Sequence, residues 1–435
     1  MKLYSTKHIS PDVDLKEAVL KGLPSDNGLY MPYEINPLPK EFWNNLENYT
    51  FTEMAFHIAQ HLIGEDVPSE ELKKIIQSAY DFEAPLVEVG AVNILELFDG
   101  PTLAFKDFGA RFMGRLMGYF LRNNDKEVNI LVATSGDTGS AVAHGFLNVD
   151  RIKVTILYPK GKVSDIQEKQ FTTLGANITA LEIDGTFDDC QALVKQAFLD
   201  EELNKKLTLS SANSINIARL IPQSFYYIYA YKQLKNKNLP LYFSVPSGNF
   251  GNLTAGLFAK KMGLPVMKMI ASTNANNVFT VYHHTGDFAP KKSVQTLSNA
   301  MDVGNPSNFT RMMDLYQNEL SKVQEEIAAY SFTDEQTKEC IQKIYQNFGY
   351  LMCPHTAVGY LGMEQFIEEN DLNPLEINAV VLSTAHPVKF GEVVEPILGF
   401  TPEIPERLKK AIGTNKQSIE MSNDYTTFKQ WLMDK

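Results

Sequence analysis

The sequence predicts an α/β protein in which two open parallel-sheet lobes follow an N-terminal helical domain. The chain has 435 residues, which is more than one hydrophobic core usually holds. Beyond residue 80, short apolar runs alternate with turns and amphipathic segments, the pattern of parallel strands covered by helices. One strand-loop-helix device also occurs twice, once in each expected lobe. These three observations predict the fold class.

Helical spacing dominates the chain as far as residue 80. Apolar side chains recur at helical intervals from Phe51 to Ile63. A second amphipathic run begins at Ser69, where we expect the serine to cap a helix with an acidic first turn. We therefore predict a helical domain over residues 1–80.

Strands are predicted where a short apolar run is followed by turn residues. These runs are Val128–Thr134, Val154–Tyr158, Ile178–Ile183, Leu241–Val245, Val266–Ala271 and Val380–Thr384. A Tyr-rich helix over Pro222–Leu234 and the polar run Lys235–Pro240 separate the third run from the fourth. We therefore expect one lobe over residues 81–237 and a second over residues 238–435. Helices are also expected over Asp334–Asn347, ending near Gly349, and over Thr356–Glu369.

Composition and charge exclude several classes of protein. Hydrophobic residues make up 44% of the chain, and 40 Lys and Arg stand against 52 Asp and Glu, a net charge of −12. This balance offers no basic surface to nucleic acid or to an anionic membrane, so we expect neither as a partner. The three cysteines are too scattered for a disulfide framework, and no apolar run approaches the ~20 residues of a membrane span. A cytoplasmic enzyme is the expectation.

The repeated device is a candidate anion site in each lobe. The first copy runs from the strand at Val128–Thr134 into Ser135–Gly139, and the second runs from Leu241–Val245, through Pro246, into Ser247–Gly251. Small residues before a helix let backbone N–H groups approach an anion at the positive end of that helix. The alternative for each copy is an ordinary tight connection between a strand and a helix.

Lys106 is a candidate nucleophile because Ala104, Phe105, Phe108 and Phe112 surround it in the sequence. Desolvation in an apolar pocket lowers the proton affinity of an amine and frees it to attack a carbonyl, as in Schiff-base chemistry. The alternative is a solvated lysine on an amphipathic helix. A lysine nucleophile together with two anion loops is the set that a pyridoxal phosphate enzyme needs.

Other motifs are weaker or absent. Asn213–Arg219 groups amides, a hydroxyl and a guanidinium that suit a phosphate or carboxylate, and Ser383–Pro387 ends a predicted strand. Either segment could instead be a simple cap or turn. The chain contains no GxGxxG, GxxxxGK[ST], HExxH or GxSxG motif. His283 and His284 are adjacent and should point apart, so we interpret them as surface or packing residues and predict no metal.

These motifs together resemble the threonine synthase family over nearly the full chain. The matching segments are Leu97–Gly109, Ala133–Gly139, Ser211–Arg219, Val245–Gly251, Leu297–Gly304 and Thr384–Phe390, preceded by Lys2–Thr6 and Gly28–Pro32. The resemblance implies two parallel-sheet lobes of the tryptophan-synthase-like fold type II behind the N-terminal domain. It also implies pyridoxal 5′-phosphate as cofactor and the conversion of O-phospho-L-homoserine and water to L-threonine and phosphate, by a monomer or homodimer.

The resemblance also implies roles for individual residues. Lys106 matches the lysine that carries the cofactor and then moves protons. The loop of Ser247, Gly248, Asn249, Phe250 and Gly251 matches the cradle for the cofactor phosphate, and Thr384 matches the residue that faces the pyridine nitrogen. Thr134, Ser135 and Thr138 match the turn that receives the substrate carboxylate. Asn213, Ser214 and Arg219 match the groups that hold the substrate phosphate.

The sequence departs from many relatives of this fold at Asp137, where they carry Asn. Whether this side chain is charged in the site therefore stays open. His355 and His386 lie in matching turns, and we interpret both as structural. Two alternatives to a threonine synthase remain. One is a related phospho-lyase that releases a 2-oxo acid, and the other is a non-catalytic amino-acid-binding protein of the same fold.

Overall fold

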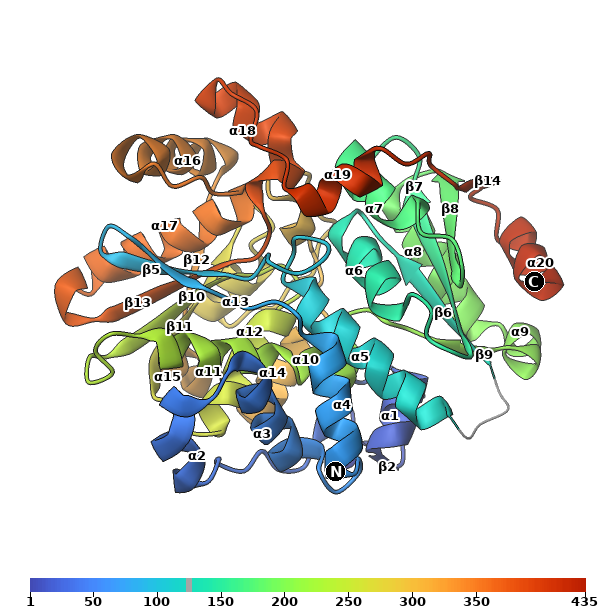
Figure 1. Ribbon diagram of the computed structural model, residues 1–435, viewed down its shortest axis with the longest axis horizontal. Coiled ribbons are helices and arrows are strands. Elements are labelled where there is room, and N and C mark those ends of the chain that lie inside the picture. Colours follow the sequence, from blue (N-terminus) through green and yellow to red (C-terminus); the bar gives the residue numbers. More distant parts are fainter. Residues whose placement is uncertain (123–126) are drawn as a thin grey trace.

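The computed structural model describes residues 1–122 and 127–435 and shows two sheets, each covered by helices (Figure 1). The larger sheet has the strand order β12-β11-β10-β13-β5-β4 and the smaller one β14-β8-β7-β6-β9. Every neighbouring pair in both sheets is parallel except β4 and β5, which are antiparallel. The α/β class with parallel sheets is therefore confirmed.

The smaller sheet holds the first anion loop. Its strands are β6 (Val128–Ala133), β7 (Ile152–Pro159), β8 (Ile178–Asp184), β9 (Thr208–Ser210) and β14 (Ile419–Ser422). Its helices are α6 (Asp137–Phe146), α7 (Asp165–Thr172), α8 (Phe187–Leu199), α9 (Glu201–Lys206) and α20 (Tyr425–Asp434). Helix α8 packs against β6 and β7, and α20 packs against α8. Burial on both faces explains why the inner strands β6 and β7 are mostly apolar, whereas the edge strand β14 is largely exposed.

The larger sheet holds the second anion loop. Its strands are β4 (Leu86–Val89), β5 (Val92–Glu96), β10 (Leu241–Pro246), β11 (Val266–Thr273), β12 (Ile327–Ser331) and β13 (Asn378–Ser383). The helices around it are α12 (Gly251–Lys261), α13 (Val278–Thr285), α14 (Phe309–Leu315), α15 (Leu320–Glu326), α16 (Asp334–Phe348), α17 (Pro354–Glu369) and α18 (Gly391–Leu398), with short 3₁₀ turns η2 (Asn299–Met301), η3 (Pro374–Glu376) and η4 (Pro387–Phe390). Helix α17 crosses β10, β11 and β13, and α16 ends at Gly349 in the left-handed conformation, as predicted.

The N-terminal segment adds a small sheet to the predicted helices. Strands β1 (Lys2–Ser5), β2 (Val13–Asp14) and β3 (Tyr30–Pro32) pair antiparallel in the order β2-β1-β3. The helices are α1 (Leu15–Lys21), α2 (Lys40–Asn45), α3 (Phe51–Ile63) and α4 (Ser69–Ala79), with the 3₁₀ turn η1 (Leu46–Asn48). The predicted Ser69 cap is wrong, because Ser69 is the first helical residue and Pro68 precedes it as the cap.

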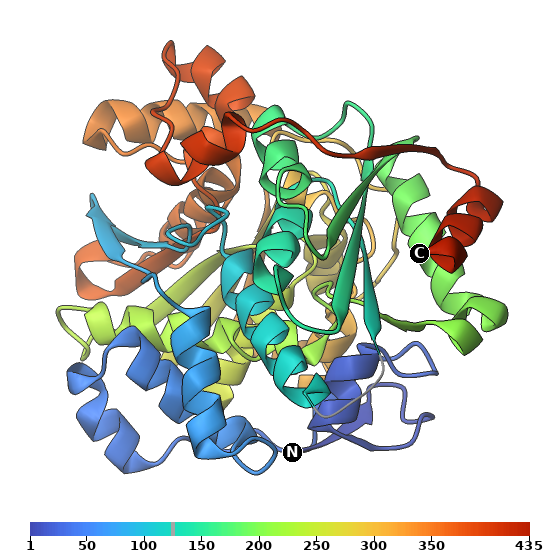
Figure 2. The ribbon, with the colours of Figure 1, turned by 45° about the vertical axis from the view of Figure 1, so that its right-hand side comes forward.

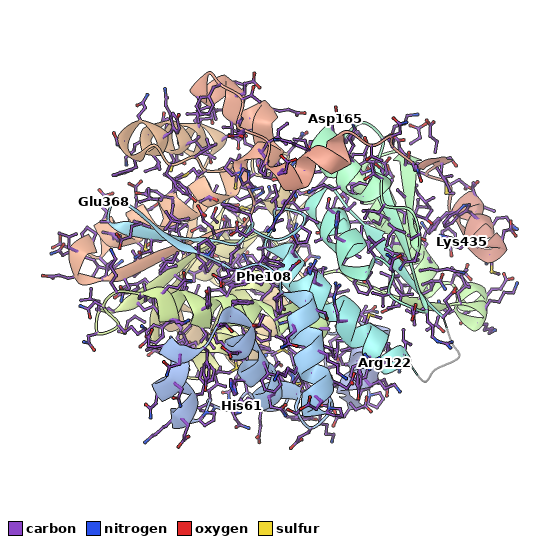
Figure 3. The ribbon with its side chains drawn as sticks, in the orientation of Figure 1. His61, Phe108, Arg122, Asp165, Glu368 and Lys435 are labelled. Carbon is purple, nitrogen blue, oxygen red and sulfur yellow. The ribbon has the colours of Figure 1, made fainter. Side chains whose placement is uncertain are left out.

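Helices α5 (Lys106–Leu121), α10 (Ile217–Leu220) and α11 (Gln223–Gln233) lie between the two sheets and the N-terminal segment. Helix α5 packs against α4, α6 and α10. Phe108 on α5 is fully buried in the interior (Figure 3), and it belongs to one hydrophobic cluster with Leu3, Ile58 and Phe243. The N-terminal segment therefore shares the core of the two sheets.

Each sheet contains strands from both sides of the expected boundary at residue 237. Strands β4 and β5 precede the boundary and join the larger sheet, whereas β14 follows the boundary and joins the smaller one. After α18 the chain crosses to the smaller sheet, where α19 (Glu406–Ile412) packs against α7 (Figures 1 and 2). Within residues 1–122 and 127–435, no helix is long and apolar enough to cross a bilayer.

Candidate active site

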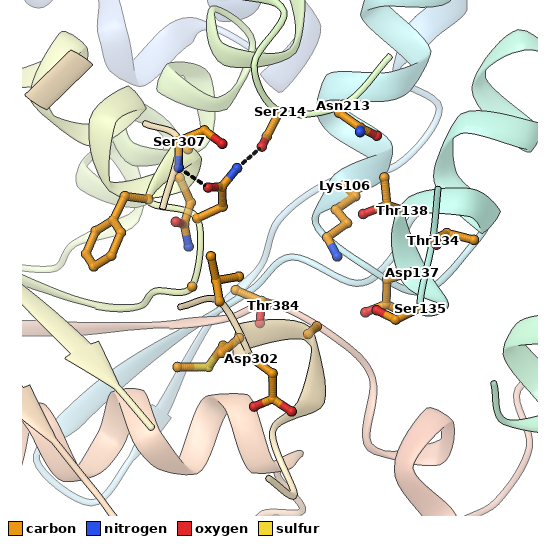
Figure 4. Close-up of a pocket in the computed structure, with 18 of the residues that line it drawn as sticks. Lys106, Thr134, Ser135, Asp137, Thr138, Asn213, Ser214, Asp302, Ser307 and Thr384 are labelled. Carbon is orange, nitrogen blue, oxygen red and sulfur yellow. Dashed lines mark hydrogen bonds between the residues drawn. The ribbon is translucent and has the colours of Figure 1, made fainter. Parts of the chain in front are cut away.

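A cavity of about 340 Å³ lies between the two sheets, at the carboxyl ends of β6, β10 and β13. Ligands of open α/β sheets commonly bind at this edge. Every predicted site residue except Ser247 lines the cavity, namely Lys106, Thr134, Ser135, Thr138, Asn213, Ser214, Arg219, Gly248, Asn249, Phe250, Gly251 and Thr384 (Figure 4). The tertiary structure thus brings both anion loops and the lysine to one site.

Lys106 is placed by pairing between the segment before α5 and the end of β13. The Leu97 N–H donates to the Ser383 carbonyl at 2.9 Å, and the Phe105 N–H donates to the Thr384 carbonyl at 2.9 Å. Lys106 follows directly as the first residue of α5. This pairing holds the lysine beside Thr384, which belongs to a distant part of the sequence.

The Lys106 side chain enters the cavity between Thr384 on one side and Thr138, Asp137 and Ser135 on the other (Figure 4). Burial lowers the pKa of its amine to about 8; the Asp137 carboxylate opposes this effect, and the charges of Lys389 and Arg219 add to it. The direction of this shift agrees with the prediction, although Lys106 is only partly buried and its neighbours in the cavity are polar. About one tenth of the amine is then uncharged at pH 7, far more than for a lysine in water.

Asp137 is a buried carboxylate in an ion pair with Lys389, at 2.6 Å. The Gln167 side-chain amide also donates to it at 2.9 Å. Burial alone would raise the pKa of Asp137, but the charges of Lys389 and Lys106 outweigh burial and hold it below its ordinary value. Asp137 is thus ionised, and this answers the question left open by the sequence. Lys389 was not predicted, although it lies within a matching motif between two apolar residues.

The first anion loop is shaped by glycine and by Thr134. Gly136 has φ 144°, a conformation that favours glycine. The Thr134 hydroxyl accepts hydrogen bonds from the N–H groups of Gly136 at 3.0 Å and Gly139 at 2.8 Å. Thr134 therefore supports the loop from within, while Ser135 and Thr138 are the hydroxyls that it offers to a ligand.

The second anion loop leads from β10 into α12. Ser247 lies outside the cavity, because its N–H donates to the Ser272 carbonyl at 2.8 Å and its hydroxyl donates to the Val245 carbonyl at 2.9 Å. A contact between Ser247 and the cofactor stays a prediction, and both hydrogen-bond donors of this residue already have protein acceptors. A Cβ atom at Gly248 would lie 2.7 Å from the Cα of Met301, so only glycine fits there.

Arg219 and Asn213 carry polar atoms that are buried in the cavity wall without a partner. These atoms are Nε of Arg219 and Oδ1 of Asn213. Burial lowers the pKa of the Arg219 guanidinium to about 10, so it stays charged at neutral pH. The unpaired Nε is covered by α5, where a Cβ atom at Gly109 would lie 2.8 Å from it. Arg219 therefore marks a candidate anion site as a charged residue of the cavity wall, and not through this atom.

The histidines have structural contacts. His386 accepts a hydrogen bond from the Val388 N–H at 3.2 Å and so caps η4, as predicted. His355 accepts from the Ala300 N–H at 3.3 Å but also lines the cavity, and burial lowers its pKa to about 4.

His283 and His284 are packing residues, in agreement with the sequence interpretation. Their Nε2 atoms lie 2.8 and 3.2 Å from carbonyl oxygens of β12. Both rings therefore reach the same strand instead of pointing apart. In the described part of the chain, no group of three or more His, Cys, Asp or Glu side chains could hold a metal ion.

Comparison with known proteins identifies the family of this chain. Residues 94–384 match the model for pyridoxal-phosphate dependent enzymes, residues 2–80 that for the threonine synthase N terminus, and residues 356–432 that for the threonine synthase C-terminal region. Threonine synthase from Escherichia coli (strain K12) is 43% identical over the full length of both chains. The crystal structure of E. coli threonine synthase covers both chains fully with a TM-score of 0.91. That of PLP-bound threonine synthase from Brucella melitensis covers 100% of this chain and 99% of its own, with a TM-score of 0.93 and 33% identity.

The fold and the cavity define a pyridoxal phosphate-dependent enzyme of fold type II. The cavity fits this cofactor, because it offers an amine of lowered pKa, a glycine loop at the start of α12 and a charged guanidinium. Within that class, the chain belongs to the threonine synthase family.

Proposed function

We propose that this cavity converts O-phospho-L-homoserine and water to L-threonine and inorganic phosphate. One observation carries the proposal: a single cavity holds a lysine amine of lowered pKa, two anion loops and a charged arginine. The reaction needs an amine for covalent attachment and proton transfer, and it needs separate sites for the cofactor phosphate and for the two anionic groups of the substrate.

Lys106, the loop Gly248–Gly251 and Thr384 would hold the cofactor. When bound, pyridoxal 5′-phosphate supplies a sink for the electrons released when a proton leaves Cα of an amino acid. Helix α12 begins at Gly251, and the backbone N–H groups of its first turn would bind the cofactor phosphate. Thr384 offers a hydroxyl and not a carboxylate to the ring, which suits elimination and replacement.

Ser135 and Thr138 would receive the substrate carboxylate, and Asn213, Ser214 and Arg219 would hold the substrate phosphate. This division rests on the hydroxyls that face the cavity on the first loop and on the charge of Arg219 in the cavity wall. A guanidinium binds phosphate through parallel hydrogen bonds. Its charge would also stabilise the phosphate as the Cγ–O bond breaks.

Lys106 would move the protons of the reaction. With a pKa of about 8 the amine is a competent base near neutral pH. It would remove a proton from Cα and then one from Cβ, so that phosphate leaves from Cγ. Water would then add at Cβ and protons would return to the carbon chain, which completes L-threonine.

Product analysis tests the proposal. The purified holoenzyme is incubated with O-phospho-L-homoserine, and threonine, phosphate and 2-oxobutyrate are measured. We expect threonine and phosphate in equal amounts. Phosphate with 2-oxobutyrate and no threonine would assign a phospho-lyase, and binding without turnover would assign an amino-acid-binding protein.

We further propose that the enzyme works in the cytoplasm as a monomer or homodimer. The net charge of −12 and the scattered cysteines support a reducing, aqueous compartment. Light scattering of the purified protein measures the oligomeric state, and fractionation of the source cells measures the compartment.

A further inference from the structure

Arg311 on α14 is a fully buried arginine without a carboxylate partner. Its side chain has no exposed surface. Nε and Nη2 donate to the Tyr30 carbonyl at 3.2 and 3.0 Å, Nη2 also donates to the Ile215 carbonyl at 2.7 Å, and Nη1 donates to the Asn308 side-chain oxygen at 2.9 Å. Among the ion pairs of residues 1–122 and 127–435, none includes this guanidinium. Every acceptor that it contacts is therefore neutral.

The acceptors of Arg311 lie directly behind the cavity wall. The Asn308 amide donates to the Asn249 carbonyl at 3.1 Å, and the Asn249 amide donates to the Ser214 hydroxyl at 2.7 Å. The dashed lines in Figure 4 that end at Ser214 and Ser307 are the two hydrogen bonds of the Asn249 side chain. A Cβ atom at Gly251 would lie 3.5 Å from Asn308 Nδ2. Arg311 thus sits one residue behind the loop assigned to the cofactor phosphate.

An ionised side chain without a counter-charge is costly to bury. Burial lowers the pKa of Arg311 to about 9, so the guanidinium is still charged at neutral pH. Neutral carbonyls satisfy its hydrogen bonds but leave its charge uncompensated. The nearby cavity wall is built to receive an anion, and a charge in a low-dielectric surrounding acts beyond direct contact.

We propose that Arg311 is a positioning residue whose uncompensated charge is balanced by the phosphate of the bound cofactor. The guanidinium orients Asn308, and through it Asn249, and it supplies positive charge behind the phosphate loop. Arg311 does not line the cavity, so its effect on the phosphate is indirect. The substrate loop at Ser214 and Ile215 is held by the same side chain.

The test compares two ligands of the apoprotein that differ only in the phosphate, pyridoxal 5′-phosphate and pyridoxal. Their Kd values are measured by fluorescence quenching for the wild type, Arg311→Met, Arg311→Gln and Arg311→Lys. Arg122→Met is the matched control, because Arg122 is an exposed arginine at the opposite end of α5 from Lys106. Melting temperatures without ligand report the purely structural contribution of each side chain.

We expect Arg311→Met to weaken pyridoxal 5′-phosphate binding about tenfold or more and to leave pyridoxal binding within about twofold. Arg311→Lys, which keeps the charge, should retain most of the preference for the phosphorylated ligand. Should the methionine variant fail to fold, Arg311→Gln carries the test, because it is neutral but still donates hydrogen bonds. Two results would overturn the proposal. One is that the neutral variants bind both ligands more weakly by the same factor, and the other is that they prefer pyridoxal 5′-phosphate over pyridoxal as strongly as the wild type does.

Discussion

Replacing Lys389 by methionine tests how strongly the buried ion pair with Asp137 stabilises the protein. The two side chains are 0% and 4% exposed and 2.6 Å apart. Lys389 also donates to the Thr102 carbonyl at 2.7 Å, and this carbonyl keeps a second donor, the Gln170 amide at 3.0 Å. The main effect is therefore that the buried Asp137 carboxylate loses its ion-pair partner. Removing one partner of such a pair costs about 3–5 kcal/mol.

Urea denaturation of the apoprotein at pH 8 measures this cost. Lys409→Met is the matched control, since Lys409 forms an exposed pair with Glu406, and such pairs contribute little. The double variant Lys389→Met with Asp137→Asn should recover much of the stability, because no charge is then stranded. A Lys389→Met protein within about 1 kcal/mol of the wild type, or a double variant with additive losses, would refute this reasoning.

The same pair gives the stability a defined pH dependence. The pKa of Asp137 is lower in the folded protein than its ordinary value. Its contribution is therefore complete above the unfolded pKa of about 4 and is lost as the pH falls towards the folded value. Lys389 also lowers the pKa of Lys106, so Lys389→Met should move the acidic limb of the activity profile to higher pH.

Three further predictions concern the cavity. Lys106→Ala should abolish turnover without loss of the fold, measured by product release and circular dichroism, because it removes the proposed base; substantial residual activity would mean that another group is the base. The rate at which the apoprotein binds pyridoxal 5′-phosphate, followed by visible absorbance, should rise with pH through about 8 and then level off. The reason is that only the uncharged Lys106 amine attacks an aldehyde. A rise near the ordinary lysine pKa of about 10.4 would contradict the lowering of this pKa by burial. Gly248→Ala should weaken cofactor binding, because the added Cβ meets the Met301 backbone. Gly391→Ala is the control and should bind like the wild type, because no atom lies within 4 Å of its Cβ. Equal cofactor binding by both variants would contradict the close packing of Gly248 against Met301.

The local parts of the fold were predictable from the sequence. Strands β6, β7, β8, β10, β11 and β13 lie where the apolar runs placed them, and α16 ends at the predicted glycine. These elements follow from patterns that extend over a few residues. The short strands β1 to β5, β9, β12 and β14 were missed because their runs are brief and their stability comes from pairing with other strands.

The site was predictable as a set of residues and less so as a set of roles. The repeated loops and Lys106 carry local signals, and they meet in one cavity. Ser247 was assigned to the cofactor from its motif, but its hydrogen-bonding groups are taken up by neighbouring carbonyls. Such an assignment depends on which partners the fold supplies, and a motif does not specify them.

The sequence by itself determined the α/β class, the two anion loops, the candidate lysine and the family, because each depends on side chains that are close together along the chain. Only the tertiary structure decided which strands share a sheet, that Asp137 is ionised beside Lys389, and that Arg311 lies charged behind the phosphate loop. The physical reason is that pKa values and ion pairs depend on burial and on partners brought together from distant segments.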